Sequence, residues 1–131
     1  MDPKESEGRD KDLEKLKLVN HLFGDKQIRT VWDKDNERYL ISVVDIVEVL
    51  TESKNPRNYW AKLKERLNEE GNETVTNCHR LKLKASDGKL RSTDVTDVEG
   101  VFRIIESIPS KNAEPIKLWL AKLGKERVEE A

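Results

Sequence analysis

The stretch that decides the fold is KNPRNYWAKLKERLNEEGNETVTNCHRLKLKASDGKLR, residues 54–91. Its first half begins with Asn55 and Pro56, a pair typical of a helix start, because asparagine caps free N–H groups and proline fits the first helical position. Apolar residues then recur at helical spacing at Trp60, Leu63 and Leu67. The spacing predicts a helix over residues 56–70 that ends at Gly71 and packs one face on the core.

The second half of the stretch predicts a β-hairpin. In residues 80–84, leucines alternate with cations, so period two places Leu81 and Leu83 on the core face and the cations on the other face. Ser86-Asp87-Gly88 is a turn signal, and residues 89–92 form the expected return strand. Residues 73–76 are expected to add a short strand.

Charge is distributed unevenly along the chain. The whole chain carries a formal charge of −1, whereas residues 54–91 hold ten lysines and arginines against five acidic residues, a local charge of +5. Such a local excess is typical of a nucleic-acid-binding surface.

Segments before this stretch predict a mixture of helix and strand. Residues 13–23 have apolar positions three and four apart, which predicts a short helix ended by Gly24. Residues 27–32 and 38–42 predict the strands of a first hairpin. A helix should follow Ser42, capped by that residue with Asp45 as its partner, and its core face should be Val43, Ile46, Val47 and Leu50.

The C-terminal part predicts two further helices. Thr93 or Asp94 should cap the first, whose inward residues are Val95, Val98, Phe102 and Ile105. The second should cover about residues 113–129 and bury Ile116, Trp119, Leu120 and Leu123. The class predicted is therefore α+β, a single small domain with two β-hairpins and about five helices.

Length and composition limit the alternatives. The 131 residues fit one domain, with residues 1–12 expected to form a disordered leader and residues 13–131 the folded part, truncated from a longer protein. The single cysteine excludes an internal disulfide framework and a multi-cysteine zinc site. No apolar run approaches the ~20 residues of a membrane span, so we expect a cytoplasmic protein without a membrane partner.

The candidate site is a nucleic-acid surface formed by the helix and the second hairpin. Arginine, lysine and asparagine side chains bind phosphates and base edges. A solvated amphipathic helix is the simpler interpretation of the helix alone, but the nearly acid-free hairpin adds a second basic element. The candidate residues are Arg57, Asn58, Lys62, Lys64, Asn68, Arg80, Lys82, Lys84, Lys89 and Arg91.

Catalysis has no comparable support. Asp94, Asp97 and Glu99 resemble a metal-binding cluster, yet acids in the first turn of a helix also offset its dipole, and we prefer that explanation. Cys78 and His79 are adjacent on a predicted strand, so they point to opposite faces and cannot form a dyad. We expect no enzyme activity, no cofactor and no metal.

Four stretches of the chain resemble the Bro-N domain of phage antirepressors and viral BRO proteins. They are IRTVWDKDNERYLISVVDIVEVLTES (28–53), NPRNYWAKLKERLNEEGNETVTNCHRLKL (55–83), DGKLRSTDVTDVEGVFRIIESIPS (87–110) and AEPIKLWLAKLG (113–124). The second stretch is most similar to the bacterial branch of DNA-damage-inducible protein D. Many family members have Asn-Glu-x-Gly where this chain has Asp97-Val98-Glu99-Gly100, so any role of that asparagine does not transfer.

The resemblance implies a DNA-binding regulatory module of a prophage or DNA-damage response, with the 55–67 helix and the 80–91 hairpin facing DNA. Partners implied besides DNA are a repressor or DNA-repair protein and a second copy in a homodimer. The rival hypothesis is a protein-interaction module that uses the acidic residues around Asp94 or the basic hairpin. A nuclease using the same acids is a third.

Overall fold

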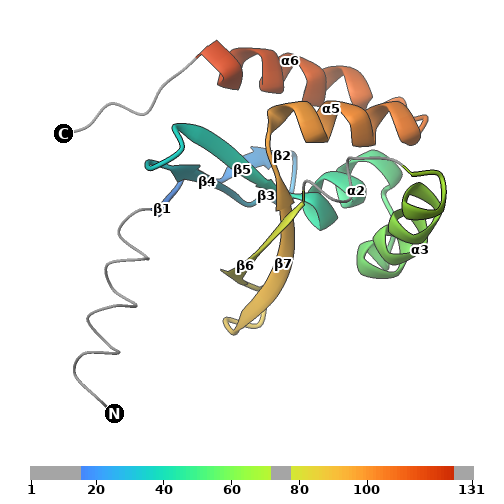
Figure 1. Ribbon diagram of the computed structural model, residues 1–131, viewed down its shortest axis with the longest axis horizontal. Helices are drawn as coiled ribbons and strands as arrows, with labels where there is room; N and C mark the ends of the chain where they lie inside the picture. Colours follow the sequence, from blue (N-terminus) through green and yellow to red (C-terminus); the bar gives the residue numbers. More distant parts are fainter. Residues whose placement is uncertain (1–15, 72–77, 126–131) are drawn as a thin grey trace.

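The computed structural model describes residues 16–71 and 78–125, and it confirms the α+β class (Figure 1). In chain order the elements are β1 (Leu16–Leu18), β2 (His21–Phe23), β3 (Lys26–Ile28), β4 (Thr30–Asp33), β5 (Arg38–Ser42), α2 (Val43–Thr51), α3 (Pro56–Glu69), β6 (His79–Lys84), β7 (Leu90–Thr96), α5 (Val98–Ser107) and α6 (Ala113–Lys125). The expected leader at 1–12, the strand at 73–76 and the end of the last helix lie outside the described residues. None of the described helices is long and apolar enough to cross a membrane.

All strand pairs are antiparallel. Five strands form one sheet in the order β1-β4-β5-β7-β6, and β2 and β3 form a separate pair. β5 and β7 share only two residue pairs, Ile41 with Thr96 and Ser42 with Val95. The β6–β7 hairpin is therefore joined to the sheet at its base, and most of its length projects beyond the neighbouring strand (Figure 1).

The N-terminal segment corrects one prediction. Instead of a helix over residues 13–23, the described part of this segment contains β1 and β2. The backbone N–H of Val19 donates to the carbonyl of Thr30 at 2.8 Å, which ties the segment to the sheet. Gly24 does not end a helix but forms the β2–β3 turn with φ at 61°, a conformation that glycine adopts without strain. Helical spacing of five apolar residues was too short a pattern to exclude paired strands.

The predicted strand over residues 27–32 is also divided. β3 and β4 belong to different sheets and are separated at Arg29. There the backbone N–H and the guanidinium of Arg29 both donate to the Asp45 carboxylate, at 2.9 and 2.8 Å. The Asp45 carboxylate therefore binds Arg29. The side chain of Ser42 makes no capping hydrogen bond at the start of α2, so the predicted cap is not formed.

The start of α5 corrects another prediction. β7 continues to Thr96, so Thr93, Asp94 and Val95 lie in a strand rather than in the first turn of a helix. Asp97 caps the helix instead, and its carboxylate accepts a hydrogen bond from the Gly100 N–H at 2.8 Å.

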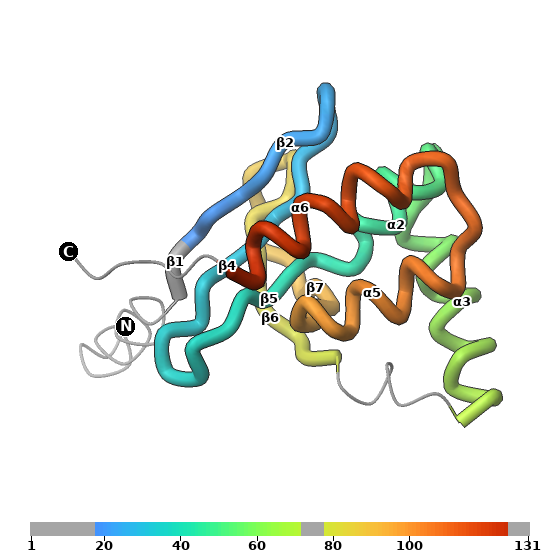
Figure 2. The backbone as a smooth tube through the Cα atoms, turned by 90° about the horizontal axis from the view of Figure 1, so that it is seen from above, coloured from blue at the N-terminus to red at the C-terminus, as the bar shows by residue number. Residues whose placement is uncertain are grey.

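The main core lies between the sheet and the helices. Figures 1 and 2 show α5 and α6 lying together over one side of the molecule, with α2 and α3 beside them. The helical stripes predicted from sequence supply this core, including Ile46 and Val47 of α2, Leu63 of α3 and Ile116 of α6. Trp119 is only half-buried and stacks on His21, with ring centroids 4.9 Å apart, which holds β2 against α6.

The β6–β7 hairpin covers part of the other face of the sheet. Leu83 packs with Val31, Leu40 and Val95 in a second, smaller apolar cluster. The guanidinium of Arg29 donates to the Lys84 carbonyl at 3.3 Å, which attaches the far end of β6 to the rest of the domain. The outward-facing side chains of β6, Arg80, Lys82 and Lys84, are left to solvent.

Gly100 provides a test of the packing at the start of α5. A Cβ atom at this position would lie 2.0 Å from Thr96 Oγ1 and 3.0 Å from Thr96 Cβ, and Thr96 is fully buried. We expect Gly100→Ala to lower the free energy of unfolding by about 1–2 kcal/mol despite the better helix propensity of alanine. Gly124→Ala in α6 is the matched control, because no atom lies within 4 Å of its added Cβ. Chemical denaturation of both variants checks this, and equal stability of the two would contradict the account.

Candidate nucleic-acid interface

Helix α3 presents a basic ridge beside its buried stripe. The side chain of Asn55 accepts from the Asn58 N–H at 3.2 Å, which confirms the predicted helix start. At 100° per residue, Arg57, Lys64 and Asn68 all lie within about 40° of one another and next to Trp60, on one side of the helix. This side is directed toward the β6–β7 hairpin, because both Trp60 and Lys64 reach β7.

The outward face of the hairpin carries the second group of cations. In the antiparallel register, Arg80, Lys82 and Lys84 stand opposite Asp94, Ser92 and Leu90, so these side chains share one face. All three cations of β6 are exposed. Leu81 and Leu83 take the inner face, as the alternation predicts.

Asp94 joins the helix to the hairpin. Its carboxylate accepts hydrogen bonds from Trp60 Nε1 at 2.8 Å, Lys64 Nζ at 2.9 Å and Arg80 Nε at 3.4 Å. The Asp94 side chain is only 14% exposed, whereas the Arg80 side chain is 73% exposed. The contact fixes α3 against the outer face of β7 and leaves the Arg80 guanidinium accessible.

The pKa of Asp94 reflects these contacts. Burial by itself would raise the pKa, but the hydrogen bonds from Trp60 and Lys64 and the charges of Lys64 and Arg80 outweigh burial. The pKa of Asp94 is therefore lowered, and the carboxylate is ionised at neutral pH.

Six of the ten predicted residues are brought together, three on the α3 ridge and three on the outer face of β6. We name this set the α3–β6 surface: Arg57, Lys64, Asn68, Arg80, Lys82 and Lys84. Within the described residues, Lys82, Lys84 and Arg57 have no ion-pair partner, while Lys64 and Arg80 share Asp94. The surface thus has five cations, and the partly buried carboxylate of Asp94 lies beside two of them.

The other four predicted residues lie elsewhere. Asn58 and Lys62 are each two positions from Trp60, which places them about 200° around α3 and away from the hairpin. Arg91 stands opposite Leu83, on the inner side of the hairpin, and its guanidinium pairs with Asp87 at 2.5 Å. Lys89 lies at the turn, next to the strand end.

Comparison with known protein families shows the family to which the domain belongs. The family model for the BRO family, N-terminal domain, matches residues 27–128. The chain belongs to the BRO family. The match covers both α3 and the β6–β7 hairpin, the two elements that form the α3–β6 surface of this Bro-N domain. No curated protein and no solved structure shows a significant match to the chain.

The acidic residues of the Bro-N domain have separate structural roles. Asp94 holds α3 on β7, Asp97 caps α5, and Glu99 pairs with Arg103 one helical turn later at 3.2 Å. Dipole stabilisation thus fits Asp97 and Glu99, but it was the wrong explanation for Asp94. Across residues 16–71 and 78–125, no group of three or more histidine, cysteine, aspartate or glutamate side chains is arranged to hold a metal ion.

Cys78 and His79 also differ in environment. Burial, followed by the charge of Asp94, raises the pKa of the Cys78 thiol to about 11. The thiol is therefore protonated near neutral pH and a poor nucleophile. His79 is exposed, with its Nε2 3.5 Å from an Arg38 guanidinium nitrogen.

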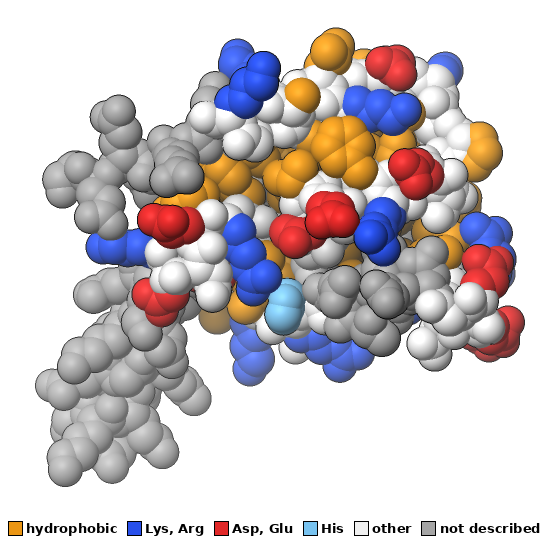
Figure 3. Space-filling model, turned by 45° about the horizontal axis from the view of Figure 1, so that its top comes forward, with side chains coloured by type: hydrophobic (Ala, Val, Ile, Leu, Met, Phe, Trp, Pro, Cys, Tyr) orange, Lys and Arg blue, Asp and Glu red, His pale blue; other side chains and the backbone are white. Residues whose placement is uncertain are grey.

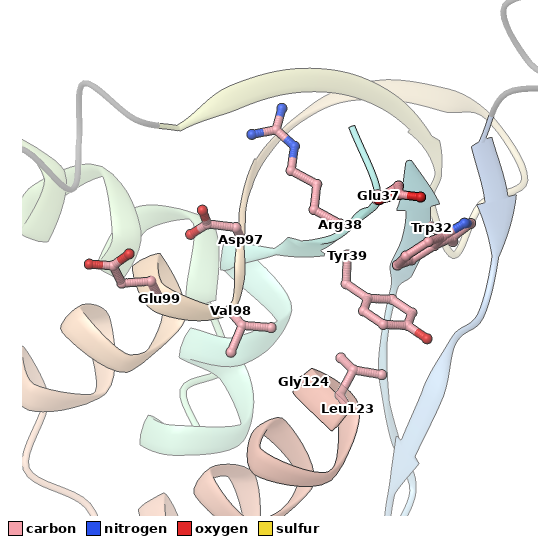
Figure 4. Close-up of a pocket in the computed structure, with 9 residues that line it drawn as sticks. All are labelled: Trp32, Glu37, Arg38, Tyr39, Asp97, Val98, Glu99, Leu123 and Gly124. Carbon is pink, nitrogen blue, oxygen red and sulfur yellow. The ribbon is translucent and has the colours of Figure 1, made fainter. Parts of the chain in front are cut away.

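A small depression of about 260 Å³ lies on another part of the Bro-N domain. Figure 4 shows Asp97, Glu99 and Arg38 toward one end and Trp32, Tyr39 and Leu123 toward the other. On the face drawn in Figure 3, acidic and hydrophobic side chains lie side by side near the middle, with Lys and Arg side chains next to them and around the margins. The depression thus differs in character from the α3–β6 surface.

The sequence did not identify Asp94 as the link between the two basic elements. The missed signal was the period-two alternation that continues beyond residue 92. Thr93 and Val95 take inward positions of β7, so Asp94 between them points outward, opposite Arg80.

Proposed function

We propose that this Bro-N domain is a DNA-binding regulatory module that contacts backbone phosphates through the α3–β6 surface. In this proposal Arg57, Lys82 and Lys84 act without a competing acid, and Lys64 and Arg80 contact phosphates while they remain close to Asp94. Asn68, on the same ridge of α3, contacts a base edge in this proposal. The function is binding rather than catalysis.

The observation that supports the proposal most strongly is the juxtaposition of α3 and β6. Two basic segments separated in sequence present their cations beside one another, because Asp94 accepts hydrogen bonds from both Lys64 and Arg80. A surface selected only for solubility would intersperse both signs of charge. Here the one acid at the junction, Asp94, is only partly exposed and is paired with two of the cations.

Salt dependence of DNA binding tests the proposal. Five phosphate contacts at ~0.9 counterions each give a log–log slope at least as steep as about −4.5 on duplex DNA. The measurement is fluorescence anisotropy of a labelled duplex titrated with the 131-residue chain, between about 50 and 200 mM salt. Absence of binding at the lowest salt, or a slope near zero, would contradict a phosphate-binding function.

The regulatory setting follows from the resemblance rather than from the site. We propose a prophage antirepressor or DNA-damage-inducible protein, in the branch that the stretch 55–83 resembles. It would act in the cytoplasm, with a second copy of the chain as its partner in a homodimer.

A protein-interaction module is the second candidate, and the depression beside Trp32 favours it. Exposed acids next to aromatic and aliphatic side chains suit a basic, partly apolar segment of a repressor or repair protein. At about 260 Å³ the depression lies below the usual ~300–1,000 Å³ of ligand pockets, so it provides one anchor point rather than a complete site.

A further inference from the structure

A second basic feature adjoins the α3–β6 surface. It is a groove of about 840 Å³, bounded by β3 and the turn before it, the outer side of α2, the start of α3 and the tip of the β6–β7 hairpin. Arg57 and Lys84 line the groove and also belong to the α3–β6 surface. The two features are therefore continuous at both the helix and the hairpin.

The charges along the groove are unbalanced in favour of cations. Arg29 and Asp45 neutralise each other through the contacts described above. The cations that remain are Lys26, Lys54, Arg57 and Lys84, against Asp25 and Glu48. Within the described part of the chain none of these four cations has an ion-pair partner. The groove thus offers uncompensated positive charge from four separate segments.

The groove is also without a stacking platform. None of the described residues that line it is aromatic. Proteins that hold single-stranded nucleic acid stack its bases on aromatic side chains, each worth about 1–3 kcal/mol. On α3, the partly exposed Tyr59 lies about 100° from Trp60 in the direction opposite to Lys64, away from the hairpin. Cations without aromatics favour the phosphate backbone of a duplex.

We propose that the groove is an additional backbone-binding site for duplex DNA, in which Lys26 and Lys54 extend the contacts made by the α3–β6 surface. The proposal rests on the DNA-binding function proposed above. Neither lysine lies on α3 or β6, and neither is a candidate residue of the sequence analysis. The ligand is the phosphodiester backbone, so these contacts contribute affinity without base specificity.

Neutralising the two groove lysines tests this site. In Lys26→Gln with Lys54→Gln, duplex affinity is expected to fall about tenfold near 100 mM salt, and the log–log slope to become shallower by about 1.8, the value for two contacts. Lys111→Gln with Lys125→Gln is the matched control, because it removes the same charge from exposed positions outside both surfaces. Its slope should remain that of the unmodified chain.

The possible results distinguish failure of the groove proposal from failure of the proposed DNA-binding function. If the unmodified chain binds duplex DNA and the groove variant has the same slope as the control, the groove proposal is wrong and the DNA-binding function stands. Failure of the unmodified chain to bind any DNA overturns both. Tighter binding of a single strand than of a duplex of equal length, with the slope reduced in the groove variant, would overturn the assignment of a duplex.

Discussion

Replacing two lysines of β6, in Lys82→Glu with Lys84→Glu, should reduce duplex DNA affinity by about a hundredfold or more near physiological salt. Each change removes a cation without an ion-pair partner in the described structure and places a carboxylate where a phosphate would lie. Both side chains point away from the Leu83 cluster, so thermal unfolding should change little. Anisotropy titration and a melting curve of the same sample measure the two effects.

Glutamate is the informative replacement because β6 is an edge strand of the sheet. Lysines on an edge strand also prevent association with other strands, a structural reason for their presence that requires no DNA. Glutamate preserves that protection, so loss of affinity in a monomeric variant identifies the DNA role. Lys111→Glu with Lys125→Glu has the same change in net charge and should bind nearly normally. Unchanged affinity of the folded β6 variant would exclude the α3–β6 surface.

Removing the Asp94 carboxylate should destabilise the domain by about 1–3 kcal/mol. In Asp94→Ala the buried Trp60 loses the acceptor for its indole N–H, and an unsatisfied buried donor costs about 1–3 kcal/mol. Lys64 loses its ion pair as well, but that side chain is about one third exposed, so the pair contributes little. Urea denaturation measures the change.

Asp94→Asn removes the charge of this residue but keeps a side-chain oxygen that can accept hydrogen bonds. The pH dependence of the stability difference therefore reports on the charge. The pKa of Asp94 is lowered in the folded protein, so its carboxylate stabilises the fold above the ordinary pKa near ~4, and that contribution is lost as pH falls through the folded pKa. The stability difference between the unmodified chain and Asp94→Asn should therefore be largest near neutral pH and shrink below about pH 4. Asp87→Asn, at an exposed pair with Arg91, is the control and should show a much smaller difference. A pH-independent difference at Asp94 would contradict its proposed ionic role.

Much of the fold follows from local sequence because the elements involved have strong local signals. Helix α3 has both a capping residue and a long apolar stripe, and β6 alternates without interruption. The segment around β1 and β2 has neither: its apolar residues fit helical spacing, and only pairing with β4 and β3 determines that they are strands. Long-range pairing of this kind is not encoded in a short window of sequence.

The composition of the candidate site was easier to predict than its geometry. Charge patterning identified both basic elements, and alternation correctly assigned Arg80, Lys82 and Lys84 to one strand face. Charge patterning did not show that Arg91 pairs on the other face, or that Lys26 and Lys54 line a groove beside Arg57. These placements depend on how β7 extends to Thr96 and on how β2–β3 lies beside the start of α3.

The most direct test of the central claim is to follow backbone amide signals by two-dimensional NMR while the 131-residue chain is titrated with a short duplex. We expect the largest shifts to fall in α3 and β6, centred on Arg57, Lys82 and Lys84, and added salt to reverse them. Shifts confined to the depression around Trp32 and Glu99, or no shifts at all, would contradict DNA binding by the α3–β6 surface.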